Sequence, residues 1–126
     1  ILNYGHTFGH ALEAYSHNAI PHGKGVIWGI DVVNFISVNM GILDQNIYME
    51  IKQLIKMSFI QEEIVVEDTT KFMEILSTDK KVKNNTIYLI LLKELSQLII
   101  KPVEIDQRLE ALFKRYLEET HEYYCN

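Results

Sequence analysis

The feature that most constrains the fold is the segment from Val26 to Val38, which is apolar nearly all round when it is drawn as a helix. Its polar side chains form only a thin stripe: Asp31, Asn34 and Ser37. A helix of this kind must be enclosed by other elements, because no side of it is suited to face water. We therefore expect a buried helix over residues 22–40, ended by Gly41, at the centre of the domain.

The remaining sequence predicts four more helices and one short hairpin around this centre. Apolar residues at helical spacing assign the helices to residues 4–16, 44–59, 69–76 and 105–123. Residues 60–67 are typical either of a short strand or of an extended link. The run from Thr86 to Leu92 is rich in β-forming residues, and residues 97–100 could pair back with it before Pro102. The predicted fold class is mainly α, with at most one small β-hairpin, and residues 1–126 form one domain.

Composition excludes several classes of protein. Of the 126 residues, 48% are hydrophobic, which is enough for a core and excludes a disordered tail. A net charge of −5 provides no positive field for nucleic acid or an anionic membrane, and no apolar run reaches the length of a membrane span. The single cysteine permits no disulfide within the chain, so we expect a cytoplasmic protein. The chain begins without Met, directly in its densest chemistry, and we interpret it as part of a longer protein.

That chemistry lies in the first 22 residues, which hold four of the five histidines: His6, His10, His17 and His22. His6, His10 and Glu13 recur at spacings that place them on one face of a helix, where two imidazoles can reach one metal ion or one substrate. Thr7 follows His6, so the zinc-protease helix motif is absent. Glycines precede His6 and His10 and follow His22, which suits close approach of a ligand. The alternative is that these glycines pack helices and the histidines bond carbonyl groups.

Two strings in the sequence carry a resemblance to a known family. Residues 2–13 read LNYGHTFGHALE, and His22-Gly23 follows twelve residues after His10. Asp79-Lys80-Lys81 stands later, ahead of a strand-like run. These strings resemble the signature of 3-dehydroquinate synthase and its sugar-phosphate cyclase relatives. The similarity spans essentially the whole chain, in the order of the helical C-terminal domain of that family.

The resemblance implies a metal site that this chain supplies only in part. His6 and His22 match two of the three protein ligands of the catalytic zinc, and the third is a glutamate in an upstream nucleotide-binding domain. Glu13 matches the glutamate of the motif, which we interpret as orienting a neighbouring histidine. The family tolerates other divalent ions in the same ligand set. We expect zinc or another divalent ion as one cofactor and NAD, bound mainly by the upstream domain, as the other.

The resemblance also implies the residues that handle the substrate. His10 matches the histidine that contacts substrate and takes part in proton transfer around phosphate loss. Asn3 matches an asparagine that hydrogen-bonds the substrate. Lys80 or Lys81 matches a lysine that binds the anionic end of the substrate, and the sequence leaves open which of the two does so.

The implied activity is that of a lyase of the shikimate pathway of aromatic amino-acid biosynthesis. It converts the phosphorylated seven-carbon sugar acid DAHP to 3-dehydroquinate with loss of phosphate, in a full-length protein expected to be a homodimer. Three departures from the family pattern put the substrate in question: Lys24 in place of a glutamate, Asn84-Asn85 in place of a glycine turn, and Leu95-Ser96 in place of Ile-Gly.

Three alternatives stay open. The first is another sugar-phosphate cyclase, of the 2-deoxy-scyllo-inosose or valiolone type. The second is the domain of a metal-dependent polyol dehydrogenase, and the third is a helical module without catalytic activity. The isolated 126-residue chain is expected to show no cyclase activity, because it lacks the upstream domain that would bind NAD.

Other conspicuous residues are assigned structural or solvated positions. His17 is expected in a solvated loop and His121 on the surface of the last helix, among acidic residues. Cys125 shows no sign of being catalytic. Trp28 and Phe35 are expected in the core.

Overall fold

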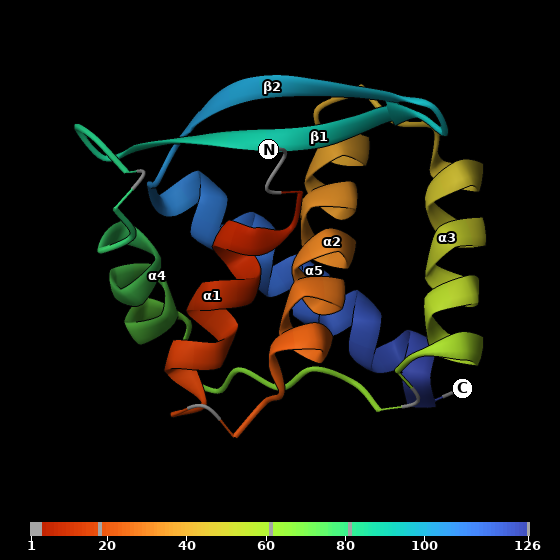
Figure 1. Ribbon diagram of the computed structural model, residues 1–126, viewed down its shortest axis with the longest axis horizontal. Helices are drawn as coiled ribbons and strands as arrows, with labels where there is room; N and C mark the ends of the chain where they lie inside the picture. The colour runs from red at the N-terminus through yellow and green to blue at the C-terminus, as the bar shows by residue number, and fades with distance from the viewer. Residues whose placement is uncertain (1–3, 18, 61, 81, 126) are drawn as a thin grey trace.

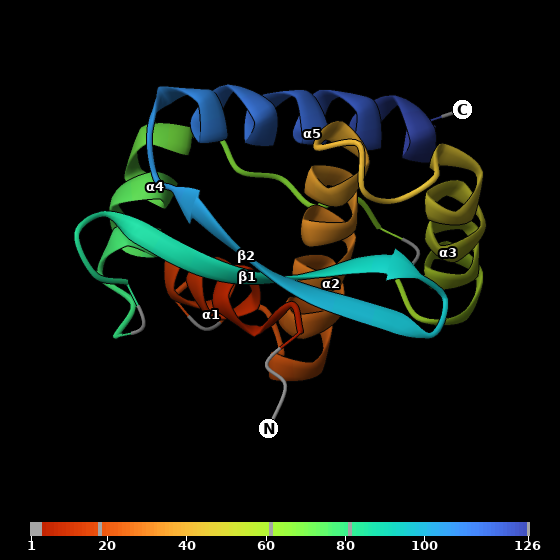
Figure 2. The same cartoon turned by 90° about the horizontal axis from the view of Figure 1, so that it is seen from above.

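Helix α2 (His22–Asn39) runs through the middle of the molecule, and the other elements are arranged around it (Figure 1). In the computed structural model, which describes residues 4–17, 19–60, 62–80 and 82–125, α2 stands in a row with three further helices. These are α1 (His6–Tyr15), α3 (Gln45–Ser58) and α4 (Thr69–Ser77). The antiparallel strands β1 (Thr86–Glu94) and β2 (Gln97–Glu104) cross one end of the row, and α5 (Gln107–Cys125) runs along its back (Figure 2).

The prediction of a buried central helix is confirmed. Trp28 and Phe35 both lie in the core, and the polar stripe of α2 is buried with them. The hydroxyl of Ser37 donates a 2.6 Å hydrogen bond to the carbonyl oxygen of Leu92, which fixes α2 against β1. After α2, the chain turns through Gly41 at a φ of 74°, a conformation that favours glycine.

A buried polar cluster joins α2 to α3 and α5. Lys52 donates hydrogen bonds of 2.6 Å to Asp31, 2.9 Å to Thr120 and 3.2 Å to the hydroxyl of Tyr48. Tyr116 donates a further hydrogen bond of 2.6 Å to the same oxygen of Asp31. Lys52 and Asp31 are each only 3% exposed. Burial makes these partners necessary, because an ion removed from water without a partner costs several kcal/mol.

Aromatic rings make up the centre of the core between α1, α4 and α5. The rings of Phe72 and Phe113 stack with their centroids 4.4 Å apart. Phe8 lies about equally far from both, with centroids at 6.1 and 6.0 Å, and Tyr116 continues the stack at 6.2 Å from Phe113. These rings tie the start of the chain to its last helix.

The predicted helix starts are confirmed for α3 and α4. Asp44 accepts a hydrogen bond from the backbone N–H of Asn46, and Asp68 does so from that of Lys71. Between these helices, the described residues of 60–67 form an extended link and belong to no strand. None of the helices in the described ranges combines the length and the apolarity that a membrane crossing requires.

Several boundaries differ from prediction, among them the starts of α1 and α5 and the ends of both strands. Pro102 does not end the second strand, which continues to Glu104 with Pro102 opposite Tyr88. Proline is tolerated there because β2 pairs on one side only, with β1, in this two-stranded sheet. The last helix begins at Gln107, two residues later than expected, because the side chain of Asp106 accepts the backbone N–H of Leu109 and caps it.

Candidate active site

Glycines allow α1 and α2 to approach each other at backbone distance. A Cβ atom on Gly9 would lie 2.8 Å from the carbonyl oxygen of Gly25, and one on Gly5 would lie 2.6 Å from the backbone nitrogen of Ile30. Gly5 also has a φ of 76°, which other residues rarely adopt. These glycines therefore pack α1 against α2, as the alternative interpretation of the sequence predicts. The same packing brings the histidines of the two helices together.

Three imidazole rings meet at this junction. Those of His6 and His10, one turn apart on α1, have centroids 5.6 Å apart. The ring of His22, from the first residue of α2, lies 6.0 Å from that of His6 and 5.9 Å from that of His10. His10 and His22 are exposed and His6 is half-buried, so the cluster is open to ligands.

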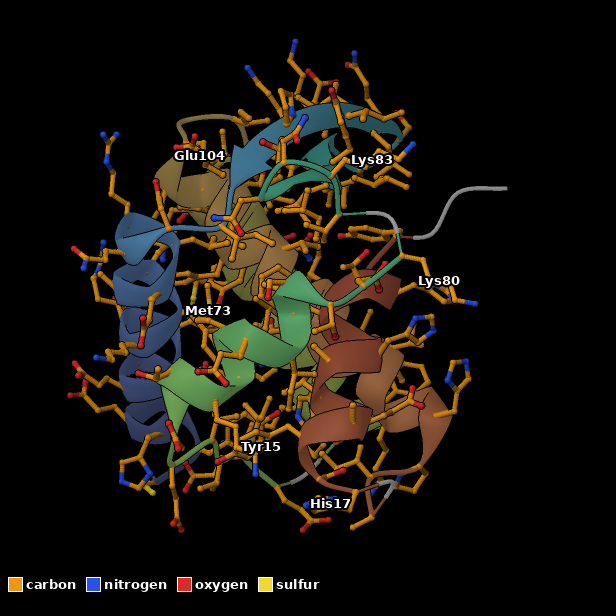
Figure 3. The ribbon with its side chains drawn as sticks, turned by 90° about the vertical axis from the view of Figure 1, so that its left-hand side faces the viewer. Tyr15, His17, Met73, Lys80, Lys83 and Glu104 are labelled. Carbon is orange, nitrogen blue, oxygen red and sulfur yellow. The ribbon has the colours of Figure 1, made fainter. Side chains whose placement is uncertain are left out.

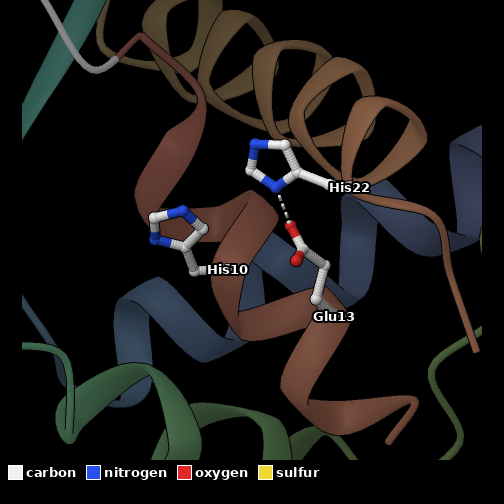
Figure 4. Close-up of side chains that lie close together, drawn as sticks. All are labelled: His10, Glu13 and His22. Carbon is white, nitrogen blue, oxygen red and sulfur yellow. Dashed lines mark hydrogen bonds and ion pairs between the residues drawn. The ribbon is translucent and has the colours of Figure 1, made fainter. Parts of the chain in front are cut away.

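Glu13 lies beside this cluster and contacts one of its members (Figure 4). Its Oε1 atom is 2.7 Å from Nδ1 of His22. Nδ1 of His6 lies 3.3 Å from the carbonyl oxygen of Tyr4. An acceptor at Nδ1 holds the proton on that nitrogen and leaves the lone pair of Nε2 for a metal ion, an arrangement common among zinc-binding histidines. The contact with Glu13 is the one that an orienting role requires.

The donor set fits a divalent transition metal. Ligand atoms of His10, Glu13 and His22 all lie within 4.8 Å of one another. His6 is not a member of that set, and its ring centroid lies 6.0 Å from that of His22. Imidazole and carboxylate groups suit zinc and its neighbours among the divalent transition metals. The geometry allows one ion to contact two of these rings while the remaining ring faces a ligand.

The Asp79-Lys80 segment lies close to His10. A hollow of about 150 Å³ between α1 and α4 is lined by residues of both helices and of the loop after α4: Thr7, His10, Ala11, Ala14, Ile75, Leu76, Thr78 and Asp79. Lys80 is exposed and projects outward from that loop (Figure 3). Asn3 and Lys81, the other two residues assigned to the substrate, lie outside the described residues.

Lys24, which stands where the family pattern has an acidic residue, forms an ion pair with the link after α3. Its Nζ atom lies 3.4 Å from a carboxylate oxygen of Glu62, and the side chains of Lys24 and Glu62 are 42% and 76% exposed. The other departures leave the fold intact. Asn84 and Asn85 adopt positive φ values of 54° and 59°, as expected of asparagine in place of glycine. His17 is exposed, as predicted.

The sequence did not indicate the role of Tyr4, which contacts both Asn34 and His6. Its hydroxyl donates to the side-chain oxygen of Asn34, and burial raises the pKa of this hydroxyl to about 12. Its carbonyl oxygen is the one that faces His6. Nothing in the sequence indicated this, because a tyrosine thirty residues from its partner carries no local pattern.

The fold has clear relatives among solved enzymes. Two crystal structures of 2-deoxy-scyllo-inosose synthase superpose on this chain with TM-scores of 0.74 and 0.75, at 19% and 22% sequence identity. They cover 90% and 94% of this chain and 31% and 34% of theirs. The second was solved with carbaglucose-6-phosphate, NAD+ and Co2+. At this identity the match shows the fold, which is that of a domain of sugar-phosphate cyclases.

Sequence comparison then gives the family. Residues 1–82 match the family described as 3-dehydroquinate synthase C-terminal, and the chain belongs to it. Similar relatives are the 3-dehydroquinate synthases of Clostridium tetani, 36% identical over 85% of this chain, and of Clostridium botulinum, 34% identical over 84%. That of Streptococcus pneumoniae is 30% identical over 90%. The chain spans 28–32% of the length of these relatives.

Proposed function

We propose that this chain is the metal- and substrate-binding domain of a 3-dehydroquinate synthase, which converts DAHP to 3-dehydroquinate with loss of phosphate. The observation that carries the proposal is the meeting of His6, His10 and His22 beside Glu13, in a chain that belongs to this family. The relatives at 30–36% identity are named for the same activity.

In this proposal, His6 and His22 hold a divalent ion through their Nε2 atoms. Glu13 fixes the ring of His22 by accepting a hydrogen bond from its Nδ1–H group, and the carbonyl oxygen of Tyr4 does the same for His6. When bound, such an ion polarises a substrate hydroxyl and makes the neighbouring proton easier to remove. A carboxylate from outside this chain would complete the ligand set.

His10 is the proposed proton carrier. It is exposed, its ring packs within 6 Å of the other two, and it borders the hollow that leads to Asp79. Imidazole ordinarily titrates near neutral pH, so it can both accept and return a proton during phosphate loss. Lys80 or Lys81 would hold the anionic end of the substrate. NAD would be bound by another part of the protein, and we propose a cytoplasmic homodimer as its setting.

One alternative has a specific observation behind it. The solved neighbours are 2-deoxy-scyllo-inosose synthases, and Lys24 breaks the family pattern next to His22. A cyclase that acts on another sugar phosphate would use the same histidines for the same proton and metal chemistry. The substrate is therefore the part of the proposal that most needs a test.

The test is product analysis with the full-length protein that carries this chain, NAD and a divalent metal. We expect DAHP to give inorganic phosphate and 3-dehydroquinate without net NADH. Turnover of a hexose 6-phosphate in place of DAHP would establish the other cyclase. Accumulation of NADH without phosphate release would identify a polyol dehydrogenase and overturn both.

Variants separate the roles of the histidines. His22→Ala should abolish metal binding and turnover together. His10→Ala should retain the metal and lower kcat by about 10²–10⁴-fold. The exposed His17, which lies outside the cluster, provides the matched control, and His17→Ala should change neither. Loss of metal from His10→Ala and retention by His22→Ala would contradict the assignment.

A further inference from the structure

A second group of metal-binding side chains lies at the end of α5, outside the histidine cluster. His121 and Cys125 are one turn apart on the last part of that helix, and Glu63 faces them from the extended link after α3. Nδ1 of His121 is 2.7 Å from a carboxylate oxygen of Glu63. The sulfur of Cys125 is 3.7 Å from the imidazole nitrogens and 4.0 Å from Glu63. Figure 2 shows α5 along the opposite side of the molecule from α1.

The two elements that supply these ligands are fixed to each other. The hydroxyl of Tyr124 donates a 3.0 Å hydrogen bond to the carbonyl oxygen of Ile60, a residue with no exposed surface. Lys56 donates to the carbonyl oxygen of Tyr123 at 3.3 Å, and its ammonium lies over both tyrosine rings. The last turn of α5 is therefore held against the link that carries Glu63, so the three ligands are brought together by the fold.

The distances suit a small tetrahedral ion. Ligands at about 2.0–2.3 Å from zinc are separated from one another by roughly 3.3–3.7 Å in a tetrahedron. The contacts of Cys125 with His121 and Glu63 are close to that range, and the pair of Glu63 and His121 needs to open by about half an ångström. The C-terminal end of a helix also carries partial negative charge, which favours a cation.

We propose that Glu63, His121 and Cys125 bind a divalent transition metal ion of the zinc class, with the fourth position open. Thiolate and imidazole ligands favour Zn2+, Co2+ and similar ions over Mg2+ and Ca2+, which prefer oxygen. The ion would clamp α5 to the link after α3 and add a second metal to the one proposed at the histidine cluster. Because no residue is shared, this site stands whether or not the proposed function is correct.

The competing interpretation is a surface ion pair between Glu63 and His121 with a bystander thiol. The two differ in one measurable property, since only a metal site forms a bond to sulfur. Cys125 is the one cysteine of this chain, so a thiolate-to-cobalt charge-transfer band that appears on titration with Co2+ and is lost in Cys125→Ser comes from this site. We expect this band to appear in the full-length protein, with the thiol kept reduced, and to saturate at one ion per chain.

Matched variants make the result decisive. Cys125→Ser should abolish the band, and Glu63→Gln should weaken Co2+ binding at this site by at least tenfold. Glu122→Gln, an exposed carboxylate next to His121, and His22→Ala at the other cluster should leave the band unchanged. Absence of the band with Co2+ in excess of two ions per chain would overturn the proposal. An unchanged Co2+ affinity in Glu63→Gln would also overturn the proposal, because His121 and Cys125 alone would then explain the binding.

Discussion

Polar side chains on α2 meet two different environments. At the first residue of the helix, His22 is exposed and faces Glu13 and two further imidazole rings. Nine residues later, Asp31 is buried and takes all its contacts from within the protein, from Lys52 and Tyr116. The buried group accepts both hydrogen bonds through its Oδ2 atom and so joins three helices. His22 uses Nδ1 for its contact with Glu13, and its Nε2 atom can bind a metal ion.

The largest effect should come from breaking the buried pair. Lys52→Met leaves the carboxylate of Asp31 buried without its counter-ion, and should lower the free energy of unfolding by about 3–5 kcal/mol. Urea denaturation measures this. The control is Lys24→Met, which removes the exposed ion pair with Glu62 and should cost less than about 1 kcal/mol. Equal losses in the two variants would remove the distinction between the two environments.

Gly9→Ala should affect both stability and the histidine cluster, because it disturbs the packing of α1 against α2. The added Cβ would meet the backbone of Gly25 and should cost about 1–3 kcal/mol of stability. The same displacement moves His10 away from His22, so metal affinity should fall as well. At Gly23 a Cβ meets nothing within 4 Å, and Gly23→Ala should retain stability or gain up to about 1 kcal/mol. Thermal unfolding with and without metal compares the two.

Glu13→Gln tests the exposed environment alone. The neutral amide holds the proton of His22 less strongly, so metal affinity should fall about 10–100-fold. The free energy of unfolding without metal should change by less than about 0.5 kcal/mol, because Glu13 supports the site rather than the core. Competition with a chelator gives the affinity, and the exposed Glu67→Gln is the control. A large loss of stability would show that Glu13 is a structural residue.

Alkaline pH should weaken the buried cluster. Burial raises the pKa of Tyr48 and Tyr116 above the ordinary value of 10, and the charge of Asp31 raises both further. The unfolded chain therefore loses these protons first, so stability is intact below pH 10 and falls above it. Above pH 10, each of the two tyrosines should lower the free energy of unfolding by about 1.4 kcal/mol per pH unit. Between about pH 9 and pH 11, the free energy of unfolding should fall less in Tyr116→Phe than in the native chain.

The helices could be predicted from sequence because their signals are local. Periodicity and the capping residues Asp44 and Asp68 placed α3 and α4 to within a residue or two. The predicted hairpin is too short, because proline is a stop signal in the local sequence and the place of Pro102 in an edge strand depends on pairing partners. Local patterns contain no information about which strand has a neighbour on each side.

The two environments on α2 differ in how far sequence could predict them. Spacing placed His6 and His10 on one face, but only the family resemblance brought in His22, from the next helix. For the buried cluster, the sequence placed Asp31 on an enclosed helix but gave no signal for its partners. Lys52 stands on an amphipathic helix where a solvated position is the ordinary expectation, and its contact Thr120 is 68 residues away. Such pairings become visible only when the helices are packed.

The aromatic stack has a consequence for how the protein is made. Phe8 contacts Phe113, so the helix that carries His6 and His10 completes its core only with residues from the last helix. During synthesis, α1 and α2 leave the ribosome long before α5 does, and contacts so distant in sequence close late and slowly. Until then, the apolar surfaces of α1 and α2 are exposed on the nascent chain. A chain truncated before Phe113 should therefore accumulate as aggregate even though its histidine motif is complete.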